Sequence, residues 1–128
     1  MPVCVLRVAG DCARVQQFLA QSRLQPDTVF WRGEARGNGR VVARSGFNLL
    51  LSESNGLPEQ AQQVTAWAVA HEDAVRLIAR FGFESVSIDF GLHGAATQER
   101  PWPSDSIPVA IARLAAQLGA SIELSFYE

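Results

Sequence analysis

The chain has 128 residues, 48% of them hydrophobic and 19% charged, with arginine as its only basic residue type besides histidine and a formal net charge of −2. This length and composition fit one globular domain, residues 1–128, and exclude intrinsic disorder and a membrane-spanning helix, which needs roughly 20 consecutive apolar residues. Two cysteines exclude a disulfide scaffold, and with no signal-like pattern at the start they predict a cytoplasmic protein with reduced thiols.

The first half of the chain predicts a strand, a helix and a hairpin. Residues 3–8 are apolar and rich in β-branched side chains, which is typical of a strand. Asp11 suits the N-cap of a helix over 12–22, whose apolar positions recur at helical spacing. Strand-forming residues on both sides of Gly37-Asn38-Gly39 then predict a hairpin over 28–52.

The second half predicts two helical regions that alternate with two strands. One apolar stripe runs through 58–82, and we expect a break near His71, where two acidic residues suit a new helix start. Residues 85–92 alternate apolar and polar side chains, as in a strand buried on one side. A helix over 106–118 and a final alternating strand over 121–127 complete the pattern.

This order of elements predicts the fold class. Strands that are polar on one face favour a largely antiparallel sheet, because a doubly wound parallel sheet needs strands that are apolar on both faces. We therefore expect an α+β two-layer sandwich, with a four- to five-stranded sheet and helices on one face, as a ferredoxin-like variant.

Several short segments, in this order and spacing, resemble a known family. They are the opening strand with its Gly10-Asp11 break, residues 24–27 (LQPD) leading into 31–34 (WRGE), Gly46-Phe47, and 114–119 (LAAQLG) running into 122–127 (IELSFY). The chain resembles the uncharacterised bacterial family catalogued as domain of unknown function 4279. That family often has tryptophan at the position of Phe47, so the aromatic character is kept. The resemblance implies an α+β fold and supplies no catalytic residue.

The predicted hairpin carries the densest basic segment, with four arginines against one glutamate over 32–44. Trp31, Arg32, Arg36 and Arg40 are candidate binding residues, because tryptophan and arginine are frequent hot spots in protein interfaces. The same residues could instead grip phosphates or stack on a base. The third interpretation is a solvated hairpin in which Trp31 covers the edge of the core.

The polar face of the last two strands and the loop before the last helix hold the other candidates. Asp89, Glu123 and Tyr127 fall on that face, where acidic groups opposite in sign to the hairpin favour charge-steered docking or self-association. His93 follows Asp89 by four positions, which leaves an oriented general base as a weak alternative. Trp102 stands between two prolines, either as an exposed docking residue or as a lid on the core.

No cysteine and histidine spacing typical of a metal site occurs, and no glycine-rich loop lies between a strand and a helix. We therefore predict a small non-catalytic protein-interaction domain without a cofactor, a monomer or homodimer, for example an immunity-like or adaptor protein. The alternative is a module that binds a small ligand or nucleic acid through the arginine-rich hairpin 28–45. The negative net charge argues against nucleic acid.

Overall fold

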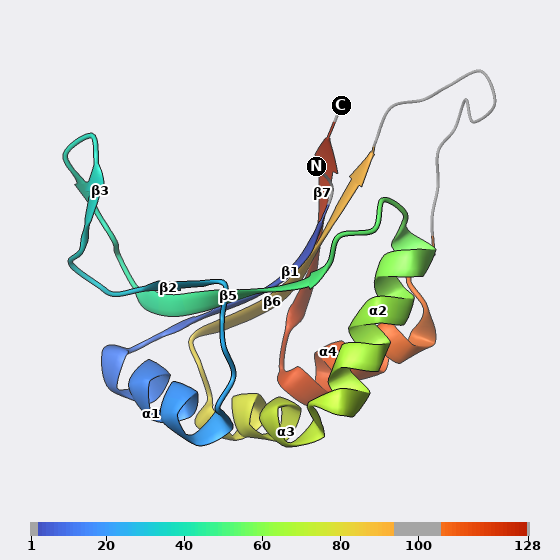
Figure 1. Cartoon of the computed structure of the whole chain (residues 1–128), viewed down its shortest axis with the longest axis horizontal. Helices are drawn as coiled ribbons and strands as arrows, with labels where there is room; N and C mark the ends of the chain where they lie inside the picture. Colours follow the sequence, from blue (N-terminus) through green and yellow to red (C-terminus); the bar gives the residue numbers. More distant parts are fainter. Residues whose placement is uncertain (1–2, 94–105, 128) are drawn as a thin grey trace.

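The structure is a computed structural model that describes residues 3–93 and 106–127 (Figure 1). Its elements, in chain order, are β1 (Cys4–Gly10), α1 (Cys12–Ser22), β2 (Thr28–Phe30), β3 (Ala35–Gly37), β4 (Arg40–Val41), β5 (Ser45–Ser52), α2 (Leu57–Ala70), α3 (Glu72–Phe81), β6 (Ser85–His93), α4 (Val109–Leu118) and β7 (Ser121–Tyr127).

Five of the strands form one mostly antiparallel sheet in the order β2-β5-β1-β6-β7, and β3 and β4 form a separate two-stranded sheet. β1 pairs antiparallel with both β5 and β6, and β2 pairs antiparallel with β5. β6 and β7 are parallel, because helix α4 connects them and returns the chain to its starting direction. The predicted α+β class is therefore confirmed.

The four helices lie on one face of the five-stranded sheet (Figure 1). Between the two layers lies one continuous hydrophobic core. Cys4, Leu6 and Val8 of β1 are each at most 1% exposed, and Phe18 of α1 stacks on Phe47 of β5 with ring centroids 5.4 Å apart. β1, β5 and β6 thus each turn one row of apolar side chains toward the helices.

The helix boundaries follow local chemistry. The Asp11 carboxylate accepts a hydrogen bond from the Arg14 amide (2.9 Å) and caps α1, as predicted. The predicted break at His71 is also confirmed, since its backbone (φ −122°, ψ 41°) separates α2 from α3. The last helix begins at Val109 and not at residue 106, because Pro108 takes the extended N-cap position.

The other sheet face is less exposed than the alternation in 85–92 predicts. Ser87 and Asp89 of β6 are only 4% and 7% exposed, although they lie on the face opposite the helices. The reason is the position of β6 inside the sheet, where Arg7 of β1 and Ser125 of β7 lie on the same face and both contact Asp89. The expectation that β6 is buried on one side only is therefore wrong.

In the part of the chain that the structure describes, no helix combines the length and the apolar character needed to cross a membrane.

Candidate functional site

The connection from β2 to β5 carries a smaller hairpin, residues 33–42, which we call the arginine arm. Its turn is formed by residues 37–39, whose φ angles are +80°, +55° and +71°. These left-handed angles are accessible to glycine and asparagine at low cost, which explains the Gly-Asn-Gly sequence. The Gly33 amide donates to the Val42 carbonyl and the Val42 amide to the Glu34 carbonyl, both at 2.9 Å. The predicted turn is therefore confirmed.

The arginine arm projects on the side of the sheet opposite the helices (upper left in Figure 1). Arg36 and Arg40 lie in its two strands, and Arg32 lies at its base, where its amide donates to the Ser45 hydroxyl (3.0 Å). All three arginines are exposed, and none forms an ion pair with another described residue. Arg44, in contrast, forms an ion pair, because its guanidinium nitrogen lies 3.7 Å from a carboxylate oxygen of Glu84.

The sheet face opposite the helices, which we call the open face, has a polar centre. Asp89 accepts a hydrogen bond from the Ser125 hydroxyl (2.7 Å) and pairs with the Arg7 guanidinium (3.4 Å). The ion pair offsets the charge of Asp89, and the carboxylate is nearly buried. Among the described residues of β6 and β7, Glu123 is the exposed acidic residue on this face. Asp89 therefore adds little exposed negative charge to the open face, and docking through Asp89 and Glu123 stays a prediction.

Two aromatic rings lie on the open face above glycines. Phe30 of β2 pairs with Gly46 of β5, where an added Cβ would come within 2.8 Å of the Phe30 ring. Tyr127 of β7 lies over Gly91 of β6 in the same way, and an added Cβ would come within 2.9 Å of its ring. Each ring covers backbone that a glycine leaves bare, which is a recognised way to stabilise glycine in a sheet.

The structure does not bring Asp89 and His93 together. Both belong to β6 and are four residues apart, which corresponds to about 13 Å along an extended strand. Both carboxylate oxygens of Asp89 already have partners in Arg7 and Ser125. His93 is exposed at the end of the strand and pairs in register with Tyr127. Asp89 is therefore not positioned to orient the His93 imidazole as a general base.

The two candidate tryptophans have different outcomes. Trp31 is partly buried and packs against the core, as in the interpretation in which it covers the core edge. Its carbonyl accepts a hydrogen bond from the Glu34 amide (3.1 Å), so it also anchors the base of the arginine arm. Trp102 lies outside the described residues.

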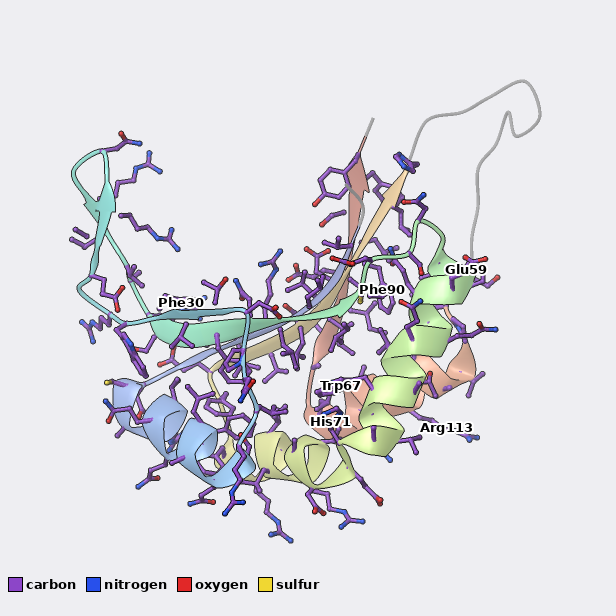
Figure 2. The ribbon with its side chains drawn as sticks, viewed as in Figure 1. Phe30, Glu59, Trp67, His71, Phe90 and Arg113 are labelled. Atoms are coloured by element: carbon purple, nitrogen blue, oxygen red, sulfur yellow. The ribbon has the colours of Figure 1, made fainter. Side chains whose placement is uncertain are left out.

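The helical layer contains a groove that sequence reasoning missed. It has a volume of about 670 Å³ and lies between α2, α3 and α4, with Arg76, Arg80 and Arg113 among its lining residues. Arg76 forms an ion pair with Glu72, with 2.5 Å between the guanidinium nitrogen and the carboxylate oxygen. Figure 2 shows Arg113 on this side of the molecule, whereas Phe30 lies by β2. From the sequence alone, the spacing of Arg76 and Arg80 could place these two side chains on one side of a helix. It could not bring Arg113 beside them, since α4 is far away in the sequence.

Of the two cysteines, only Cys12 is exposed. Burial raises the pKa of the Cys4 thiol to about 12, and the charge of Asp89 acts in the same direction. A thiol with such a pKa stays protonated and is a poor nucleophile or metal ligand. Among the described residues, no group of three or more histidine, cysteine or acidic side chains could hold a metal ion.

Comparison of the chain with family models, with curated proteins and with solved structures gives no match. The resemblance to domain of unknown function 4279 therefore stays a prediction from the residues.

Proposed function

We propose that this chain is a non-catalytic cytoplasmic protein-interaction domain whose arginine arm docks on an acidic surface of a partner protein. The observation that carries this proposal is the arm itself. Residues 33–42 form a hairpin that extends away from the core and presents Arg36 and Arg40 to solvent without an ion pair to any described residue.

A structural role does not account for the arm. Val41 is 63% exposed, and Val42, near the base, is the one arm residue whose side chain is buried. A direct connection from β2 to β5 would preserve their pairing, since the register runs from Thr28 to Phe30 and ends before the arm begins. Guanidinium groups form bidentate contacts with carboxylates, so an acidic protein surface is a chemically matched partner.

A protein partner is favoured over a nucleic acid because the net charge is −2 and the arm brings only a few arginines. Nucleic-acid binding depends on many phosphate contacts to basic residues, which makes a broad basic surface its usual footprint. A free phosphate-bearing ligand would need donors converging on one point, whereas the arm offers a narrow two-stranded projection.

The test is capture of binding proteins from source-cell lysate, without and with nuclease, by three forms of the chain. The wild type is compared with the double variant Arg36→Glu and Arg40→Glu, and with Arg80→Glu and Arg113→Glu as a control of equal charge change on the helical side. We expect one stoichiometric protein to be retained by the wild type and the control and lost by the arm variant. Equal capture by all three forms would disprove the role of the arm. If the retained protein is lost when nuclease is added, the chain binds nucleic acid and the proposed protein contact is wrong.

A further inference from the structure

The edge of the sheet formed by β7 is long, regular and apolar. β7 runs for seven residues, Ser121–Tyr127, and pairs with β6 without a bulge. Leu124, Phe126 and Tyr127 are 43%, 64% and 44% exposed. Proteins usually protect an edge strand with charged side chains, proline, a bulge or short length. β7 has no proline, lysine, arginine or bulge, and Glu123 is its one charged residue. The opposite edge, β2, has only three residues.

We propose that β7 pairs with β7 of a second copy of this chain in antiparallel orientation, so that two sheets join into one. The pairing that uses all seven residues places Leu124 at the twofold axis, opposite itself. Ile122 then faces Phe126 of the second copy, and Ser121 faces Tyr127. On the helix side of the sheet this register aligns the apolar side chains of the two strands, which is the favourable arrangement for cross-strand neighbours.

The charge distribution of the strand also suits a second copy. Glu123 is the only charged residue in β7, and in this register it faces Ser125 and not another carboxylate. A twofold axis perpendicular to the sheet keeps the helices of both copies on one face and the two open faces on the other. The arginine arms, which project from the open side, remain free in this dimer.

Cysteine cross-linking tests the register. Cys12 is exposed, so it is first replaced by serine. In that background Leu124→Cys places two thiols across the axis, at a Cα separation of roughly 4.5–5.5 Å that a disulfide can span. Ser121→Cys is the matched control on the same strand, because its two copies would lie about 20 Å apart. We expect oxidation to give a covalent dimer of Leu124→Cys and none of Ser121→Cys.

Sedimentation of the wild type supplies the second measurement, with an expected mass of twice the 13.9 kDa monomer. Leu124→Arg should give a monomer, because two like charges would meet at the axis. Val69→Arg, at a site 76% exposed on α2, should remain a dimer.

A monomeric wild type overturns the proposal, and so does a dimer in which Leu124→Cys fails to cross-link. The dimer does not depend on the arginine arm, so the double variant of Arg36 and Arg40 should sediment as the wild type does.

Discussion

Asp89 shows how strand order creates a polar centre from three distant residues. Its carboxylate accepts from the Ser125 hydroxyl and pairs with Arg7, 82 positions earlier in the chain. We expect Asp89→Ala to lower the free energy of unfolding by about 1–3 kcal/mol, because it leaves the Ser125 hydroxyl without its acceptor in a partly buried place. Urea denaturation measures this loss.

The double-mutant cycle with Ser125→Ala separates the hydrogen bond from other effects of the substitution. Ser125→Ala alone should cost about 1 kcal/mol, and the two losses should sum to more than the loss in the double variant. Simple additivity would show that the contact between Ser125 and Asp89 contributes nothing. Glu53→Ala, at an exposed position, should change stability by less than about 0.5 kcal/mol.

Cys4 lies on the helix side of β1 and is fully buried, and burial raises the pKa of its thiol from 9.0 to about 12. Between these values the unfolded chain loses the thiol proton while the folded chain keeps it. Stability should therefore fall as pH rises from 9 toward 12, and it should fall less steeply in Cys4→Ala. Urea denaturation across this pH range measures both slopes.

Thiol labelling near neutral pH, where the chain is folded, tests whether the Cys4 thiol is buried. A maleimide should modify one thiol per chain in the native state, that of Cys12, and two after unfolding in urea. Rapid native labelling of both cysteines would contradict the buried position of Cys4.

At the scale of elements, β5 depends on Gly46 for its close approach to both neighbours. A Cβ at this position would collide with the carbonyl oxygen of Val8 in β1 and with the ring of Phe30. We expect Gly46→Ala to lower the free energy of unfolding by about 1–3 kcal/mol, because the strand would have to shift. The measurement is urea denaturation of Gly46→Ala alone and together with Phe30→Ala.

The double variant distinguishes the two obstacles. Phe30→Ala removes the ring but leaves the backbone carbonyl of Val8, so adding Gly46→Ala to Phe30→Ala should still be destabilising. If the double variant were as stable as Phe30→Ala alone, the ring and not the packing of two strands would be the cause.

Elements that depend on neighbouring residues could be predicted from the sequence, whereas contacts between residues far apart in the chain could not. Alternation within 85–92 predicts β6, and the Gly-Asn-Gly sequence predicts the turn of the arginine arm, because both depend on neighbouring residues. The pairing of Asp89 with Arg7 and Ser125 depends on β6 lying between β1 and β7, which no local pattern reveals. The groove with Arg80 and Arg113 was missed for the same reason, since α3 and α4 meet only in the folded chain.

At the scale of the whole molecule, the single core predicts one cooperative unfolding transition. The buried core includes residues from β1, β5, β6 and all four helices, so no part of it can separate without exposing the rest. Trp31 and Trp67 are suitable reporters, because both pack against this core, one after β2 and the other from α2 near His71 (Figure 2).

Two variants that keep one of these tryptophans each, with the others replaced by phenylalanine, should unfold in urea at midpoints that agree with their own far-ultraviolet circular dichroism. Protein concentration must be the same in all measurements, since the midpoint of a dimer depends on it. Fluorescence of Trp31 that changes before the circular dichroism would mean that the β2 edge opens separately. In that case residues 1–128 would not behave as one domain, and the arginine arm would be attached to a sheet edge that unfolds independently.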